Sequence, residues 1–145
     1  MLTVSSLSYC PLGSGLLTGK YKRPEDFVEG SFAAIRPALS EPESFANNMK
    51  LVEKIEEWAA KKGCTPAQFA INWVASLSRR PGMPVIIPIP GGSRVERVQE
   101  NLKIVELTDK DMDEVDAFLK TYERTGEWLV DHAKASLDTT NTTEI

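Results

Sequence analysis

The sequence has little histidine and cysteine: one histidine and two cysteines in 145 residues. Cys10 and Cys64 lie far apart, and neither belongs to a Cys-x-x-Cys or His/Cys pattern, so we expect reduced thiols and neither a disulfide framework nor a zinc site. His132, the single histidine, lies in a weakly patterned stretch near the end of the chain, and we assign it no catalytic role. These residue types therefore predict no metal site.

The sequence also lacks a long hydrophobic run and an excess of positive charge. No apolar stretch reaches the length of a membrane span, and residues 1–10 lack the basic start and long apolar centre of a signal peptide, so we expect a cytosolic protein. The net charge of −4 argues against nucleic acid or an anionic membrane as the main partner. The hydrophobic content of 41% and charged content of 26% are typical of a soluble globular protein with a core.

A strand is predicted where β-branched residues cluster in the second half of the chain. Residues 85–87 and Ile89 form a short apolar run that suits a strand buried on both faces of a parallel sheet. Pro88 and Pro90 mark the point where regular pairing stops. A second strand is expected at residues 2–9, where Val4, Leu7 and Tyr9 alternate with small hydroxyl residues.

The stretch after the first of these strands predicts a tight turn and a helix start. Gly91 and Gly92 let the backbone turn and approach a ligand, and Ser93 with Glu96 matches a capping box. The free N–H groups and the positive dipole end of such a helix would favour an anion.

Two arginines strengthen the interpretation as a phosphate site. Arg94 and Arg97 are three residues apart, which places both positive charges on one side of the predicted helix. A purely structural interpretation stays open, because Gly-Gly-Ser turns are common and arginines on a first turn often only face solvent.

Three further helices are predicted from apolar residues at helical spacing. The first ends at Gly63, the second begins with Thr65, Pro66 and Gln68, and the third is capped by Thr108. Between residues 21 and 42 the proline-rich, aperiodic sequence predicts a long loop. The residues expected to face inward are Phe45, Met49, Val52, Ile55, Trp58 and Ala59, then Phe69, Ala70, Trp73, Val74 and Leu77, and finally Met112, Val115, Leu119 and Tyr122.

Three stretches resemble the aldo-keto reductases, especially their fungal pyridoxal-reductase-like branch, and two of them stand in the family's order and spacing. Residues 87–102 (IPIPGGSRVERVQENL) resemble the end of the last barrel strand in that family. Residues 7–20 (LSYCPLGSGLLTGK) resemble its seventh strand and the following loop, usually written with AYSPLG. Residues 65–77 (TPAQFAINWVASL) resemble the helix before the last strand. The resemblance implies an α/β fold: the C-terminal portion of a (β/α)₈ TIM barrel, with about two strands plus helices, and hence an incomplete barrel.

The resemblance also implies that residues 7–20 bind NADP(H). From composition alone we favour an interpretation without a cofactor, in which Tyr9 belongs to the core and Lys20 to the surface. By resemblance, Tyr9 would stack on the nicotinamide ring, the backbone at Cys10, Pro11, Leu12 and Gly13 would contact the pyrophosphate, and Lys20 would lie near the phosphates.

Residues 87–102 would bind the adenosine end of the same cofactor. Many relatives place a lysine directly after the strand, where this chain has glycine, so a preference for NADPH over NADH rests on Arg97, helped by Arg94. By resemblance, Gly91 and Ser93 would contact the adenosine phosphate region, Arg97 the 2′-phosphate, and Glu100 and Asn101 the adenine edge.

No catalytic residue is assigned, because the family's Asp, Tyr, Lys and His tetrad belongs to the first half of the family's chain. We expect the C-terminal, cofactor-binding portion of a reductase that converts an aldehyde or ketone to an alcohol, inactive unless an N-terminal half completes it. The alternative is a non-catalytic half-barrel that binds nucleotide or self-associates through exposed strand edges, giving a homo-oligomer. We expect residues 1–125 to form the NADP-binding domain and residues 126–145 a disordered tail.

Overall fold

The computed structural model describes residues 5–31 and 33–126. These residues form two compact units, one of residues 5–21 with 50–123 and one of residues 22–49 with 124–126. The predictions for His132 and for a disordered tail lie outside the described residues, except at Gly126. Along the chain the elements are β1 (Ser5–Tyr9), η1 (Gly13–Thr18), η2 (Pro24–Asp26), α1 (Pro37–Ser40), α2 (Pro42–Lys62), α3 (Pro66–Ser76), η3 (Leu77–Arg79), β2 (Val85–Ile89), α4 (Val95–Asn101) and α5 (Asp109–Thr121).

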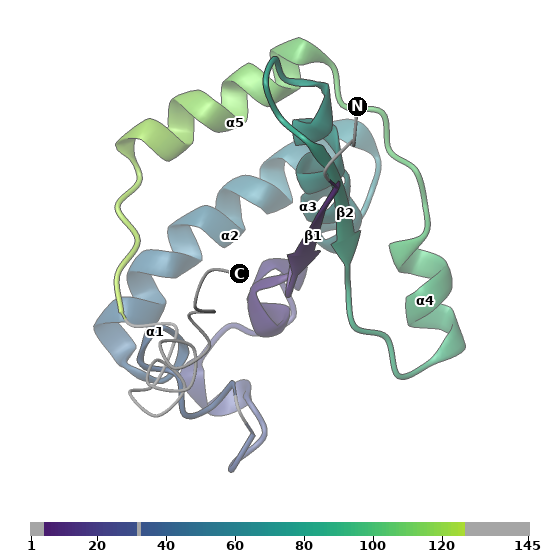
Figure 1. The fold of residues 1–145 in the computed structure, drawn as a ribbon. Helices are drawn as coiled ribbons and strands as arrows, with labels where there is room; N and C mark the ends of the chain where they lie inside the picture. Colours follow the sequence, from purple (N-terminus) through teal and green to yellow (C-terminus); the bar gives the residue numbers. More distant parts are fainter. Residues whose placement is uncertain (1–4, 32, 127–145) are drawn as a thin grey trace, which may run out of the picture. The chain divides into compact units, whose positions relative to one another are not determined.

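The two predicted strands pair with each other. β1 and β2 are parallel, with Ser5 opposite Val85 and Tyr9 opposite Ile89 (Figure 1). Parallel neighbours need a crossover between them, and here the chain from η1 to η3 supplies it. The carboxyl ends of both strands therefore lie at one edge of the sheet, where the loops that follow them meet.

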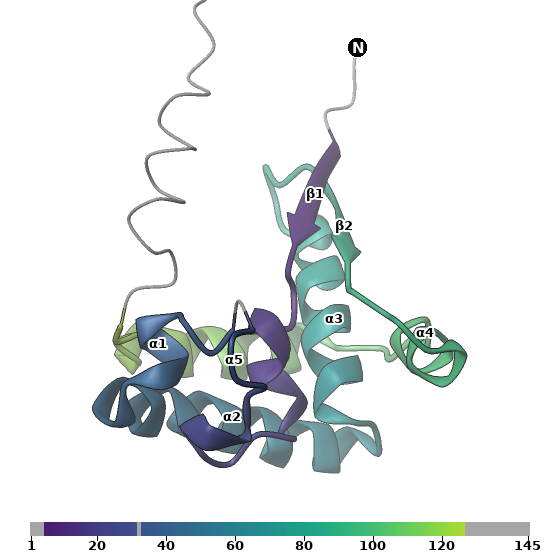
Figure 2. The same ribbon diagram turned by 90° about the horizontal axis from the view of Figure 1, so that it is seen from below.

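One face of this sheet is covered and the other is exposed. α3 packs behind the strands, where it leaves Ile86 and Pro88 half-buried (Figures 1 and 2). The prediction that β2 is buried on both faces is wrong, because no described residues cover the second face. The apolar residues on that face are exposed by 44% to 78%: Leu7, Tyr9, Val85, Ile87 and Ile89.

Pro88 lies inside β2, so the prediction that it stops regular pairing is also wrong. The Ile86 N–H donates to the Ser78 hydroxyl (2.8 Å), which in turn donates to the Ile86 carbonyl (3.4 Å). Both backbone groups of Ile86 therefore point away from β1. Since backbone direction alternates along a strand, Pro88 points to the same outer edge, where its missing N–H costs no ladder hydrogen bond.

The hydrophobic core of the larger unit lies between α2, α3 and α5. Trp58 of α2 stacks on Phe69 of α3 at 5.8 Å between ring centroids and meets Phe118 of α5 edge-on at the same distance. Most residues predicted to face inward are buried or half-buried, which confirms the helical spacing. Buried members of this core are Ile55, Trp58, Ala59, Phe69, Leu107, Met112 and Val115.

The two predicted threonine caps are confirmed. The Thr65 hydroxyl accepts from the Gln68 N–H (3.2 Å), while the Gln68 side chain accepts from the Thr65 N–H (3.1 Å). Thr108 and Asp111 form the equivalent reciprocal pair at the start of α5. These local patterns fix where α3 and α5 begin.

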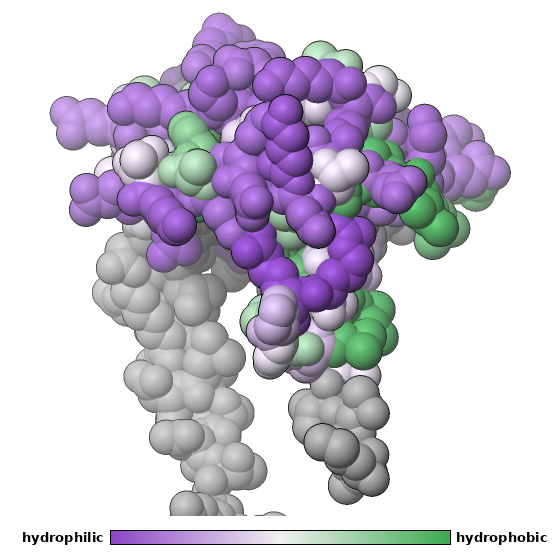
Figure 3. Space-filling model, turned by 90° about the horizontal axis from the view of Figure 1, so that it is seen from above, coloured by the Kyte–Doolittle hydropathy of each residue, from purple (hydrophilic) through white to green (hydrophobic). Residues whose placement is uncertain are grey.

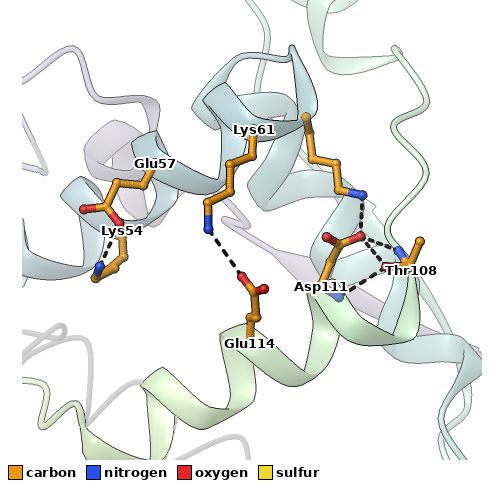
Figure 4. A network of polar contacts seen from close by, with 7 residues as sticks. Lys54, Glu57, Lys61, Thr108, Asp111 and Glu114 are labelled. Carbon is orange, nitrogen blue, oxygen red and sulfur yellow. Dashed lines mark hydrogen bonds and ion pairs between the residues drawn. The ribbon is translucent and has the colours of Figure 1, made fainter.

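Ion pairs join α2 to α5. The Lys61 ammonium lies 3.6 Å from Glu114, and the Lys62 ammonium pairs with Asp111, which is already the capping carboxylate of α5 (Figure 4).

No helix within the described ranges combines the length and apolar character that crossing a bilayer requires.

The smaller unit replaces the predicted long loop with two short helices, η2 and α1. Phe27 and Phe45 meet edge-on at 6.3 Å between centroids. The buried Asn48 amide donates to the carbonyls of Ala38 (3.1 Å) and Thr125 (3.0 Å). These hydrogen bonds hold together three segments that are distant in the sequence.

Candidate functional site

Five of the predicted cofactor residues line one cavity. The cavity has a volume of 190 Å³ and lies between the loop after β1, the first turn of α3 and helix α4. We call it the Lys20–Arg97 cavity. Its lining residues are Leu12, Thr18, Lys20, Ala67, Arg97, Glu100 and Asn101.

The other predicted cofactor residues lie outside this lining. Tyr9 is 78% exposed on the open face of the sheet. Pro11 is buried and lines a separate apolar cavity in the core. Gly91 and Ser93 are exposed in the turn after β2. The predicted cofactor residues therefore lie in a cavity, on the open face of the sheet, in a core cavity and in the turn after β2.

The loop after β1 has an uncommon backbone conformation. Cys10 has a φ of 53° and Ser14 a φ of 57°, both in the left-handed region, and Gly13 is at 55°. The Cys10 sulfur accepts a hydrogen bond from the Ser14 N–H (3.2 Å), which stabilises this tight path. The loop returns the chain so that Leu12 and Lys20 reach the same cavity.

The charges of the cavity favour an anion. Lys20 and Arg97 are both exposed, and neither forms an ion pair with any residue that the structure describes. The Lys20 ammonium lies 5.8 Å from the centre of the Tyr21 ring. Two basic side chains from separate segments, with one carboxylate at Glu100, leave the cavity a net positive charge.

The predicted capping box at Ser93 is wrong. α4 begins at Val95 with Arg94 as its N-cap, and no side chain caps it. Because Ser93 precedes the cap position, its hydroxyl is one residue too far from the first free N–H groups to cap them. α4 has only seven residues, so the anion preference rests on the Lys20 and Arg97 side chains.

The turn before α4 has room for glycine, but not for a Cβ atom, at position 92. A Cβ atom on Gly92 would lie 2.8 Å from the Val98 side chain, while Gly91 has open space around it. The Asn101 amide donates to the Gly91 carbonyl (3.4 Å) and so ties the end of α4 back to the turn.

Two residues of α3 that sequence reasoning did not assign to the site hold α4 and the chain after it. The Gln68 amide donates to the Glu100 carbonyl (3.3 Å). The Asn72 amide donates to the Lys103 carbonyl (2.9 Å), and its oxygen accepts from the Val105 N–H (3.1 Å). The spacing of Thr65 and Gln68 predicted a helix cap, but no local sequence pattern shows that Gln68 and Asn72 contact residues about 30 positions away.

The two cysteines are free thiols. Burial raises the pKa of Cys64 above its usual value, although the charges of Lys103 and Lys62 act in the opposite direction. A raised pKa leaves a thiol protonated and weakly nucleophilic at neutral pH. In the described ranges, no three His, Cys, Asp or Glu side chains are grouped so that they could hold a metal ion.

Comparisons with known proteins agree on one family. The model of the "Aldo/keto reductase family" matches residues 4–120. The chain is 38% identical to the aldo-keto reductase yakc [NADP(+)] of Schizosaccharomyces pombe over 114 residues, which are 77% of this chain and 32% of that protein. It is 34% identical over 135 residues to a pyridoxal-reductase-like protein of Saccharomyces cerevisiae, covering 87% of this chain and 39% of that one.

A solved structure shows the same relation. The glycerol dehydrogenase of Gluconobacter oxydans superimposes with a TM-score of 0.59 at 26% identity, covering 86% of this chain and 36% of that one. The chain thus spans about a third of the length of the proteins it matches. Its two parallel strands and helices correspond to part of a (β/α)₈ barrel, which confirms the predicted fold class.

Proposed function

This chain belongs to the aldo/keto reductase family, and we propose that it is the portion of a reductase that binds NADP(H). The observation that carries the proposal is the Lys20–Arg97 cavity, which is lined by two basic side chains that form no ion pair with any described residue. The name of the fission yeast relative, which includes NADP(+), supports the same cofactor.

The residues present suit the phosphate-bearing end of the cofactor. The Arg97 guanidinium can bind a phosphate through two parallel hydrogen bonds, and Lys20 adds a point charge from the segment after η1. Asn101 and Glu100 offer an amide and a carboxylate for the adenine edge. When bound, NADPH supplies the hydride, and this chain's residues hold its adenosine end in place.

The reaction we propose for the complete protein is reduction of an aldehyde or ketone to an alcohol. Hydride transfer places negative charge on the carbonyl oxygen, so an acid must donate a proton to it. By the family resemblance, the Asp, Tyr, Lys and His tetrad that does this belongs to earlier barrel units. We therefore assign this chain cofactor binding, propose that the tetrad comes from an N-terminal half, and propose that the protein acts in the cytosol.

A titration of the chain with NADPH, followed by tryptophan fluorescence, tests the cofactor proposal. We expect saturable quenching, and we expect Arg97→Ala to weaken NADPH binding about ten- to a hundred-fold, since it removes charge-assisted hydrogen bonds. Lys110→Ala is the control, because Lys110 is an exposed basic residue of α5 that does not line the cavity.

NADH separates the 2′-phosphate from the rest of the cofactor. Arg97→Ala should leave the weaker NADH binding nearly unchanged. Equal losses for NADPH and NADH would show that Arg97 does not bind the 2′-phosphate, and no binding of either cofactor to the unaltered chain would refute the proposal.

A second candidate function is self-association without turnover. The observation that favours it is the open apolar face of the β1–β2 sheet, with Ile87 and Ile89 exposed by 45% and 44%. The occupant in this case is a second copy of the chain. Its test is the concentration dependence of molecular size.

A further inference from the structure

Lys20 brings a flexible positive charge to the Lys20–Arg97 cavity. Its ammonium stands at the end of a four-carbon stem, and ordering such a stem on a ligand costs rotamer freedom. A lysine that is already held in place loses less of this freedom when an anion binds. Two neighbouring side chains, those of Thr18 and Tyr21, contact Lys20 in the structure.

The Thr18 side chain holds the backbone of Lys20. Its hydroxyl accepts a hydrogen bond from the Lys20 N–H (3.3 Å) and donates to the Gly15 carbonyl (2.6 Å). Thr18 is half-buried and lines the cavity. Because the hydroxyl has a single proton, which the Gly15 carbonyl accepts, Thr18 has no donor left for an anion. Thr18 therefore acts on a ligand through Lys20.

The Tyr21 ring holds the side chain of Lys20. The Lys20 ammonium lies 5.8 Å from the centre of this ring, within reach of a cation–π interaction. The ring itself lies against Gly15, where a Cβ atom would be 2.9 Å from the Tyr21 Cε2 atom. Gly15 is thus the common support of the Thr18 hydroxyl and the Tyr21 ring.

We propose that Thr18 and Tyr21 are positioning residues, which hold the Lys20 ammonium at the cavity for the phosphates of NADPH. The inference rests on the proposed function, because its ligand is that cofactor. It adds two residues to the site, since the family resemblance assigned Lys20 but neither of these neighbours.

Titration with NADPH, followed by tryptophan fluorescence, tests the two contacts separately. Thr18→Val removes the hydroxyl and Tyr21→Leu removes the aromatic face, and each should weaken NADPH binding about three- to five-fold. Thr18→Ser and Tyr21→Phe keep the hydroxyl and the aromatic face, so they should bind as the unaltered chain does. Where thermal unfolding shows that Thr18→Val does not fold, Thr18→Ala takes its place.

A double-mutant cycle with Lys20→Met separates positioning from a general loss of structure. When the ammonium is absent, neither Thr18→Val nor Tyr21→Leu should weaken NADPH binding further. A loss that persists in the Lys20→Met background would overturn the inference, because it would show that the two residues do not act through Lys20.

Hydrogen exchange without cofactor tests the Thr18 contact directly. Thr18→Val should accelerate exchange of the Lys20 backbone N–H about five-fold. Thr121→Val is the matched control, because the Thr121 hydroxyl also donates to a carbonyl three residues earlier (2.8 Å) but lies at the end of α5. It should change neither the exchange nor the NADPH affinity.

The outcomes distinguish this inference from the proposed function. NADPH binding that Thr18→Val and Tyr21→Leu leave unchanged would overturn the positioning roles alone. No binding of NADPH to the unaltered chain would overturn the proposed function and the positioning roles with it.

Discussion

Two glycines of the smaller unit have the same backbone conformation and different surroundings. Gly30 has a φ of 73° and Gly126 a φ of 78°, both in the left-handed region. A Cβ atom on Gly126 would lie 2.5 Å from the Ala38 Cα, whereas nothing lies within 4 Å of one on Gly30. A residue with a Cβ atom would therefore be conformationally strained at both positions, and at Gly126 it would also clash with Ala38.

We predict that Gly126→Ala destabilises the chain more than Gly30→Ala. Gly30→Ala should lower the free energy of unfolding by about 1 kcal/mol, because alanine is strained in this backbone conformation. The Gly126 variant should lose about 2 kcal/mol more, because Ala38 backbone atoms must also move. Urea unfolding of both variants measures the difference, and equal losses would show that the close approach at Ala38 does not exist.

At this scale, resemblance predicted more of the site than residue chemistry did. Leu12, Lys20 and Arg97 come from segments far apart in the sequence, and the structure places them around one cavity. Their binding role stays a prediction. Local chemistry misplaced the cap at Ser93, because a Ser-x-x-Glu pattern cannot show that the helix starts one residue later.

Helix α5 depends on one carboxylate that has two tasks. Burial alone would raise the pKa of Asp111, but hydrogen bonds from Lys62 and Thr108 and the charge of Lys62 outweigh burial and hold the pKa below its ordinary value of 3.8. The ionised carboxylate is thus favoured by folding. It caps α5 and binds α2 at the same time (Figure 4).

We predict that stability falls in acid through Asp111. A lowered pKa contributes stability above the unfolded-state value, and that contribution is lost as the pH falls through the folded-state pKa. Asp111→Asn should lower the free energy of unfolding by about 1 kcal/mol or less at pH 7, and by progressively less below pH 4. Urea unfolding between pH 3 and pH 7 measures it, with the exposed Asp113→Asn as the control. A difference in unfolding free energy between Asp111→Asn and the unaltered chain that stays constant with pH would contradict this role.

At the scale of elements, the helices were predictable and the environment of the strands was not. Thr65 and Thr108 cap helices through residues three positions away, so the sequence contains the whole interaction. Burial of β2 depends on which strands lie beside it. The apolar run at residues 85–87 correctly predicted a strand, but the open face follows from the absence of neighbours in the described structure.

The described part of the molecule exposes apolar surface on its sheet and around helix α4. Seen from above, a mainly hydrophilic face has hydrophobic areas on the side where Figure 1 places β2 and α4 (Figure 3). Val95, Val98 and Leu102 on and beside α4 are exposed by 67%, 42% and 74%. A two-stranded sheet is only marginally stable without further partners.

We predict that the chain alone associates with itself as its concentration rises. Ile87→Lys should shift the sedimentation profile toward the monomer, because a charge on the open sheet face opposes apolar contact. Ile104→Lys is the matched control, since Ile104 is 88% exposed but lies outside the sheet. A monodisperse monomer at all concentrations would rule out this behaviour.

The Ser78 hydroxyl, which binds both backbone groups of Ile86, decides how far such association can grow. With Ile86 occupied and Pro88 without an N–H, the outer edge of β2 offers no donor to an incoming strand at these two positions. Strand pairing between copies is then left to the outer edge of β1, where two-fold symmetry gives a closed dimer and no continuing filament. Ser78→Ala would release the Ile86 N–H, and light scattering should then detect open-ended polymers.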